Sequence, residues 1–139
     1  MNLPVLRHFI DGAWSASDTR EHGTVRCPAT GEPLVYVPLG TRADVDRAVA
    51  AARAAFPDWR STPPLSRARC LFRLRELLEA RFEDIARTLV REQGKTLDES
   101  RGEVRRMIEN VEHATGVTTL MTGYGLEDIA QGVDCLAEP

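Results

Sequence analysis

The sequence has few cysteines and no residues spaced for binding a metal. Its three cysteines, Cys27, Cys70 and Cys135, include no Cys-x-x-Cys pair, and its three histidines are scattered. Zinc sites and redox-active pairs depend on close spacing of such residues. We therefore expect no metal site and three reduced thiols in a reducing compartment. Cys70 lies next to the apolar face of a predicted helix, so we expect it to be a packing thiol.

Long apolar runs and an excess of basic residues are also missing. No run approaches the roughly 18 apolar residues that cross a bilayer, and residues 2–7 lack the apolar core of a signal peptide. The formal net charge is −3 and the pI is about 5.6, whereas nucleic-acid-binding domains usually carry a basic surface. These absences predict a cytoplasmic protein that binds neither nucleic acid nor a membrane.

Phosphate-binding loops are the third missing feature. No Gly-x-x-x-x-Gly-Lys-Ser/Thr motif occurs, and Gly123-Tyr124-Gly125 lacks the third glycine and the preceding strand of a dinucleotide-binding motif. We interpret these two glycines as part of a turn. The residues taken alone therefore predict no cofactor-binding site and no catalytic residue within this chain.

Residues 1–40 have the pattern of two β-hairpins. Asp11-Gly12 separates two short apolar runs, and this dipeptide readily adopts the positive φ angles of a type I′ turn. The second hairpin is expected to pair residues 24–27 with residues 34–37 through a turn that contains proline and glycine.

Residues 41–118 show helical periodicity, which predicts three or four amphipathic helices. The first has an apolar face formed by Val45, Ala48, Val49, Ala52 and Phe56. Thr41 and Asp44 form the hydroxyl-and-acid pattern of a helix start. We expect Pro57 to end this helix and Trp59 to fold back onto the core.

The next helical segment opens at residues 63–64, where two prolines suit a first turn. It would either continue unbroken past Arg81 or break there into two consecutive helices, and we expect Gly94 to form the C-cap at its end. Residues 96–99 repeat the helix-start pattern, and the helix that follows should run to about Val117. Its buried face is predicted to contain Leu97, Val104, Ile108 and Val111.

Residues 119–139 lack clear periodicity and are expected to be irregular, with the candidate start of an oligomerisation strand at residues 133–136. No partner strand for it is evident. The expected fold class is therefore α+β and mainly helical. A single segment, 1–139, would hold β-hairpins in 1–40 and helices in 41–118.

Arg106 is the charged residue that we single out. With Val104 at the centre of the buried face, a rotation of about 100° per residue puts Arg106 near the opposite side of the helix. Asn110, His113 and Val117 lie close to it there. In one interpretation this row faces solvent. In the other it lines a cleft of a larger protein, where an arginine can bind a substrate carboxylate through two parallel hydrogen bonds.

Several short motifs, in this order, resemble the aldehyde dehydrogenase superfamily. They are residues 9–14 (Phe-Ile-Asp-Gly-Ala-Trp), 28–32 (Pro-Ala-Thr-Gly-Glu), 37–40 (Val-Pro-Leu-Gly), 55–59 (Ala-Phe-Pro-Asp-Trp) and 92–96 (Glu-Gln-Gly-Lys-Thr). Residues 68–73 and 102–112 most resemble the CoA-acylating methylmalonate-semialdehyde dehydrogenases. The resemblance extends from about Phe9 to Asp134.

This resemblance implies the N-terminal portion of an enzyme several times longer, an incomplete piece of an aldehyde dehydrogenase α/β fold. Complete members oxidise methylmalonate or malonate semialdehyde with NAD and CoA, release CO2 and yield propionyl-CoA or acetyl-CoA, as in valine catabolism. They are usually homo-oligomers. Their nucleophilic cysteine, catalytic asparagine and glycine-rich NAD loop are expected beyond Pro139. This chain alone is therefore expected to be inactive and to bind neither NAD nor CoA.

The resemblance also assigns substrate-binding residues. The second arginine of the family's Gly-Glu-Val-x-Arg motif contacts the substrate carboxylate, and in this sequence it is Arg106. His113 stands near the substrate face, where the family usually has phenylalanine. Cys27 replaces a usual asparagine and Met107 a usual glycine, and these departures bear on how tightly a substrate binds.

Two other functions remain open from the sequence. The chain would be a non-catalytic helical module if it bound a partner protein through exposed apolar surface. It would be a self-sufficient enzyme of another class only if an acid, a base and a nucleophile came together, and no such set is visible.

Overall fold

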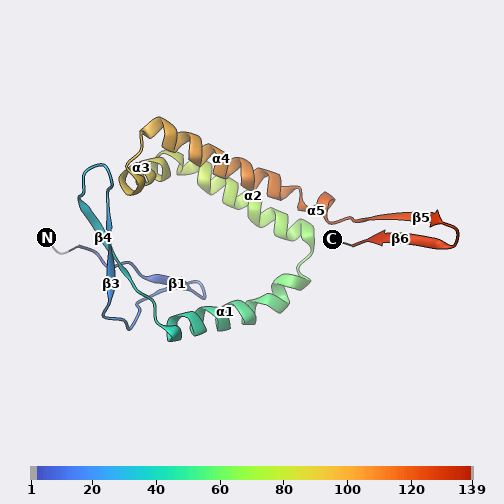
Figure 1. Cartoon of the computed structure of the whole chain (residues 1–139), viewed down its shortest axis with the longest axis horizontal. Helices are drawn as coiled ribbons and strands as arrows, with labels where there is room; N and C mark the ends of the chain where they lie inside the picture. The colour runs from blue at the N-terminus through green and yellow to red at the C-terminus, as the bar shows by residue number, and fades with distance from the viewer. Residues whose placement is uncertain (1–2, 139) are drawn as a thin grey trace. The chain divides into compact units, whose positions relative to one another are not determined.

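The computed structural model of the protein describes residues 3–138, and the elements within them are mainly helical (Figure 1). In chain order they are β1 (His8–Ile10), β2 (Ala13–Ser15), β3 (His22–Arg26), β4 (Pro33–Pro38), α1 (Arg42–Ser61), α2 (Pro64–Ala80), α3 (Phe82–Gln93), α4 (Leu97–Thr115), α5 (Val117–Leu120), β5 (Tyr124–Ala130) and β6 (Val133–Ala137). This order confirms the predicted α+β class. No helix within the described part of the chain is long and apolar enough to span a membrane.

The described chain divides into two compact units. The first unit contains Met1–Ser61 and Glu83–Arg101, and the second contains Thr62–Phe82 and Gly102–Pro139.

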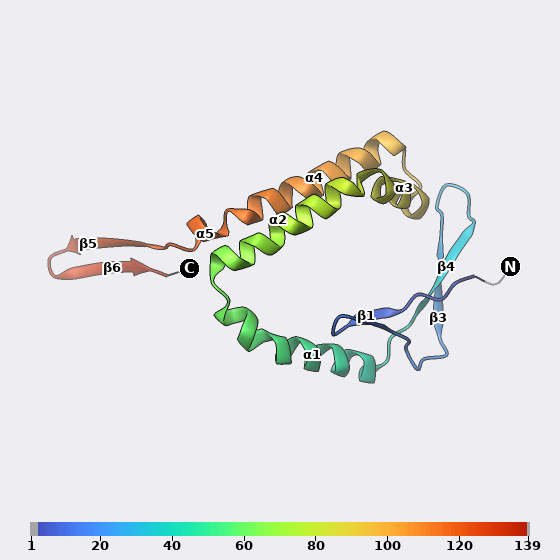
Figure 2. The ribbon, with the colours of Figure 1, turned by 180° about the vertical axis from the view of Figure 1, so that it is seen from behind.

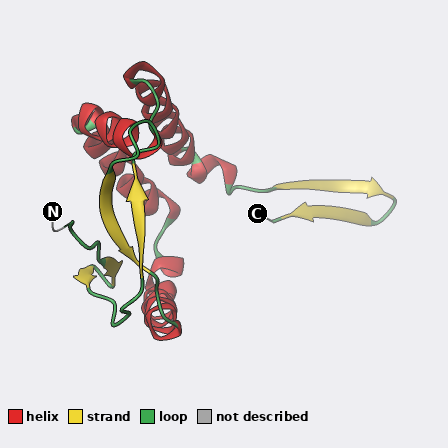
Figure 3. Cartoon of the chain, turned by 60° about the vertical axis from the view of Figure 1, so that its left-hand side comes forward, coloured by secondary structure: helices red, strands yellow, loops and turns green. Residues whose placement is uncertain are grey.

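All strands of the described chain pair as antiparallel hairpins, drawn in yellow in Figure 3. In the β1–β2 hairpin Ile10 pairs with Ala13. The φ angles of Asp11 and Gly12 between them are 53° and 73°, the left-handed values that a type I′ turn requires. The β3–β4 hairpin has Gly31 in its turn, with a φ angle of 73°. Both predicted hairpins are therefore confirmed.

Helix α1 begins where the sequence predicted but ends later. Thr41 and Asp44 cap it reciprocally: the Thr41 N–H donates to Asp44 Oδ2 at 2.8 Å, and the Asp44 N–H donates to Thr41 Oγ1 at 3.3 Å. The predicted stop at Pro57 is wrong, because α1 continues to Ser61. Proline removes one backbone N–H, and here one further turn forms beyond it. Trp59 is therefore helical and 49% exposed, not folded onto a core.

The apolar face of α1 is only partly covered in the first unit. The β1–β2 hairpin lies against small side chains of the helix, including Ala48 and Ala52. The larger side chains of the predicted face stay exposed, with 58% for Val45, 43% for Val49 and 57% for Phe56. Periodicity therefore identified the apolar face but not the extent of its burial.

Of the two alternatives for this segment, the structure has the break near Arg81. Helix α2 ends one residue before it and α3 begins one residue after it. Gly94 then caps α3 with a φ angle of 69°, and its N–H donates to the carbonyl four residues earlier at 2.9 Å. A Cβ added at Gly94 would lie 2.8 Å from the backbone nitrogen of Ala29. The β3–β4 turn and the end of α3 thus meet at a position that has no room for a side chain.

In the second unit, α2 and α4 lie side by side, as Figures 1 and 2 both show. Ala68 of α2 and Val104 and Ile108 of α4 are at most 1% exposed. The latter two confirm the centre of the predicted buried face. α4 ends at Thr115, slightly before the predicted Val117, and the short helix α5 follows.

The expectation that residues 119–139 are irregular is wrong for the described residues, because β5 and β6 form a hairpin there. Asp128 interrupts the pairing with a φ angle of 49°, and its N–H donates to Asp134 Oδ1 at 3.0 Å. Gly132 supplies the left-handed turn with a φ angle of 73°. The missing partner of the predicted strand is therefore β5. A role for this hairpin in oligomerisation stays a prediction.

Candidate functional site

An open groove in the second unit brings Arg106 together with side chains from two helices. It is lined by Leu71 of α2 and by Glu103, Arg106, Met107, Asn110, Val111 and Ala114 of α4. Most of these side chains are apolar. The polar groups are the Arg106 guanidinium, the Asn110 amide and the Glu103 carboxylate. A groove with apolar walls and a few polar groups suits a small organic ligand that carries a charge.

Arg106 differs from the other two arginines of α4 because it has no carboxylate partner among residues 3–138. Arg101 binds both oxygens of Glu83, at 2.8 and 3.0 Å. Arg105 binds both oxygens of Glu79, at 2.6 and 3.4 Å. Arg106 is exposed and faces the groove. Its guanidinium is therefore available for an anion that comes from outside the chain.

The pair formed by Arg105 and Glu79 joins α4 to α2. The hydrogen bond from Arg105 holds the pKa of the Glu79 carboxyl below its usual range, and the same bond raises the pKa of Arg105. The guanidinium also lies 4.9 Å from the centre of the Phe82 ring, within the range of a cation–π contact. Arg75 of α2 adds a 2.8 Å contact to Glu112 of α4. These contacts help to fix the two helices that form the groove.

His113 is exposed and does not line the groove. On a helix with about 100° per residue it lies roughly 20° from Arg106, but on the side away from Asn110. The groove is centred on the Asn110 side. Of the two residues that the sequence predicted for substrate binding, Arg106 therefore lines the groove and His113 does not. The substrate-binding roles of Arg106 and His113 stay predictions.

Asn110 is a groove residue for which the sequence predicted no role. Its position four residues after Arg106 was visible in the sequence, since residues four apart share a helix face. The contribution of Leu71 was not visible, because it comes from another helix.

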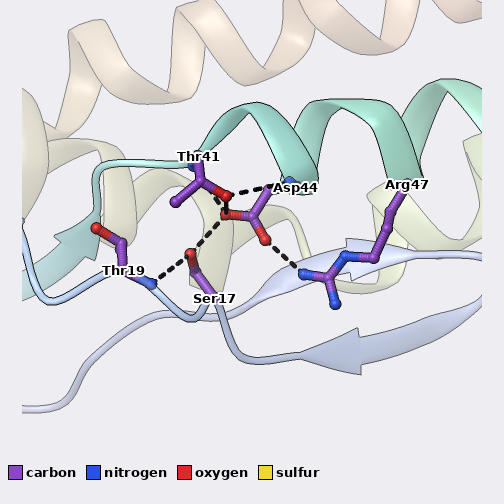
Figure 4. A network of polar contacts seen from close by, with 5 residues as sticks. All are labelled: Ser17, Thr19, Thr41, Asp44 and Arg47. Atoms are coloured by element: carbon purple, nitrogen blue, oxygen red, sulfur yellow. Dashed lines mark hydrogen bonds and ion pairs between the residues drawn. The ribbon is translucent and has the colours of Figure 1, made fainter.

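Asp44 is the buried carboxylate of the first unit, and a network of neighbours holds it (Figure 4). Ser17 Oγ donates to Asp44 Oδ2 at 2.6 Å, Thr41 donates to the same oxygen, and Arg47 pairs with Oδ1. The hydrogen bond from Ser17 is the largest cause that holds the pKa of Asp44 far below its usual range. Thr19 in turn donates its N–H to Ser17 Oγ at 3.2 Å. With both oxygens occupied, this carboxylate ties a loop to α1 and is not a binding site.

The cysteines do not form a reactive centre. Cys27 is 9% exposed, and hydrogen bonds from the Thr30 hydroxyl and backbone lower the pKa of its thiol. The Cys27 thiol thus takes part in the hydrogen bonding of the β3–β4 turn. Cys70 is exposed, so its interpretation as a packing thiol is wrong for this structure, and Cys135 is partly exposed. Within residues 3–138 no three metal-ligating side chains gather, and the cysteines are unpaired.

The described glycines do not fit the phosphates of NAD. The left-handed glycines are Gly12, Gly31, Gly94, Gly123 and Gly132. They lie in hairpin turns, at the end of α3 or directly before β5. A dinucleotide loop needs glycines between a strand and the first turn of a helix. Among the described glycines Gly40 lies between a strand and a helix, β4 and α1, but it lacks the second and third glycines of a Gly-x-Gly-x-x-Gly motif.

Comparison with known proteins gives the family. The model of the aldehyde dehydrogenase family matches residues 14–137. Malonate-semialdehyde dehydrogenase 1 of Geobacillus thermodenitrificans is 47% identical over 132 residues, which are 95% of this chain and 27% of that protein. The chain therefore spans about a quarter of the length of this relative.

Solved structures agree with this result. The methylmalonate-semialdehyde dehydrogenase of Oceanimonas doudoroffii superposes with a TM-score of 0.87 at 38% identity, over 98% of this chain and 28% of that one. A variant of aldehyde dehydrogenase C from Pseudomonas syringae, in complex with NAD+ and octanal, gives a TM-score of 0.79 at 39% identity, over 82% of this chain and 24% of that one. This chain belongs to the aldehyde dehydrogenase family.

Proposed function

We propose that this chain is the N-terminal portion of a CoA-acylating malonate- or methylmalonate-semialdehyde dehydrogenase and provides the carboxylate-binding side of its substrate site. The complete enzyme would convert malonate semialdehyde, NAD+ and CoA to acetyl-CoA, CO2 and NADH, and the methylated substrate to propionyl-CoA. The observation that supports this function is the unpaired Arg106 in the groove. Two relatives of this chain are named for semialdehydes that carry a carboxylate.

Arg106 would hold the substrate by its carboxylate and not by its reacting aldehyde. A guanidinium and a carboxylate match in geometry and form two parallel hydrogen bonds. The apolar side chains of Leu71 and Met107 would contact the short carbon chain. A neutral aldehyde of the same length lacks the charged contact, so Arg106 would favour semialdehydes over propanal.

NAD would be bound outside this chain, since its glycines do not fit a dinucleotide loop, and we propose the same for CoA. When bound, NAD accepts a hydride and CoA accepts the acyl group. We therefore propose that the chain alone forms no NADH. The homo-oligomeric state and cytoplasmic location expected from the sequence are part of this proposal.

The test requires an enzyme with all its parts. We therefore consider a chimera of the Geobacillus relative in which the matching 132 residues are replaced by this chain, and we call it the completed enzyme. We expect it to form NADH from malonate semialdehyde with CoA, and we expect Arg106→Ala to raise KM for this substrate. The loss of a charge-assisted bidentate contact costs on the order of 2–4 kcal/mol, or about 30-fold or more in KM. KM for propanal should change little. An equal loss for both aldehydes would disprove the carboxylate role.

A second candidate function is a non-catalytic module that binds a partner protein. Its support is the exposed apolar side chains of each unit, such as Phe56 in the first, which is 57% exposed, and Phe72 and Leu136 in the second, which are 53% and 72% exposed. Such surfaces commonly mark interfaces. Sedimentation of the purified 139-residue chain as a defined complex with one other polypeptide would support this second function. NADH formation by the chain alone would contradict both functions.

A further inference from the structure

The groove contains one polar side chain with no assigned role, the amide of Asn110. It is exposed, lies one helical turn after Arg106 and lines the same groove. No hydrogen bond joins it to another residue within the described chain. The Asn110 amide can donate two hydrogen bonds and accept two. It is thus free to bind a ligand in the groove, where Arg106 supplies the positive charge.

We propose that Asn110 is a second specificity-determining residue, which donates a hydrogen bond from its amide to the carboxylate that Arg106 holds. This inference rests on the proposed function. Side chains four residues apart on a helix have Cβ atoms about 5–6 Å from each other, which allows both to reach one carboxylate. A carboxylate has about four acceptor positions, and a bidentate arginine uses two of them. The Asn110 amide fills a third.

Glu103 and Asn110 lie on opposite sides of Arg106 along the groove. At about 1.5 Å per residue along the helix, Glu103 lies before Arg106 and Asn110 lies after it, and all three line the groove. A carboxylate substrate is repelled by a second carboxylate and attracted by an amide N–H. The substrate carboxylate therefore binds between Arg106 and Asn110, and its carbon chain extends along Met107 and Ala114.

The experiment measures the completed enzyme with malonate semialdehyde, with propanal, and with malonate as an inhibitor of propanal oxidation. We expect Asn110→Ala to raise the semialdehyde KM and the malonate inhibition constant about ten-fold, the effect of one hydrogen bond to a charged group. Asn110→Asp should raise both further, because it adds a like charge. The kcat for propanal should stay within about two-fold of the parent value, as expected when a contact to the carboxylate alone is lost.

Glu109→Gln is the matched control, since Glu109 is exposed on α4 and does not line the groove. The inference fails if Asn110→Ala leaves both constants unchanged, or if it lowers kcat equally for both aldehydes, because Asn110 would then act on the carbonyl. If Arg106→Ala also leaves them unchanged, the proposed function itself fails. Malonate binding by titration calorimetry gives the same comparison without turnover.

Discussion

Gly94→Ala is expected to destabilise the protein strongly, because the substitution meets two obstacles. Gly94 has a φ angle of 69°, and the left-handed conformation costs an alanine roughly 1–2 kcal/mol. The new Cβ would also lie 2.8 Å from the Ala29 backbone nitrogen and 3.2 Å from its Cβ. Backbone atoms in a hairpin turn move less easily than a flexible side chain, and overpacking of this kind costs about 1–3 kcal/mol. The sum predicts a loss of about 2–5 kcal/mol.

Gly31→Ala separates the two obstacles. Gly31 has a φ angle of 73°, and nothing lies within 4 Å of its added Cβ. This variant should therefore lose only the conformational part, about 1–2 kcal/mol. Urea unfolding of both variants, followed by far-UV circular dichroism, measures the difference. If Gly94→Ala costs no more than Gly31→Ala, the close contact between the β3–β4 turn and the end of α3 does not exist in solution.

Two further predictions concern the cores of the two units. Ile108→Ala should lower the free energy of unfolding by about 2–5 kcal/mol, because Ile108 is fully buried. Met107→Ala should lower it less, because Met107 is 37% exposed. Equal losses of the two variants in urea unfolding would contradict the assigned rotation of α4. Asp44→Asn should flatten the dependence of stability on acid pH. The folded pKa of Asp44 lies below its unfolded value of about 3.9, mainly through Ser17, so its ionised form stabilises the protein above about pH 4. That contribution is lost as the pH falls through the folded pKa, and the melting temperature between about pH 5 and pH 2 should fall less in the variant than in the parent protein.

Features that depend on neighbours in the chain were predictable from the sequence. The helix starts at Thr41 and Thr96 are examples, since each needs only an acid three residues later to accept hydrogen bonds. The turn at Asp11-Gly12 is another, because two adjacent residues set its geometry. Pro57 misled the prediction because a proline near the end of a helix does not prevent one more turn.

Features that depend on distant residues were not predictable. Ser17 binds Asp44 across 27 positions of sequence, and no local pattern connects them. The β5–β6 hairpin was missed because Asp128 bulges out of β5 and breaks the alternation that identifies a strand. The exposure of Val45 and Phe56 was missed for a related reason, since periodicity identifies an apolar face without saying what covers it.

The rotation of α4 explains why only one of two adjacent arginines faces the groove. Val104 and Ile108 are buried one turn apart, and they fix which side of α4 faces inward. At about 100° per residue, Arg105 then lies on one flank of the helix, where it pairs with Glu79 of α2. Asn110 lies roughly 140° away on the other flank. The buried side chains and the ion pair therefore act together. They hold α4 so that the next residue, Arg106, remains at the edge of the groove with its charge unpaired.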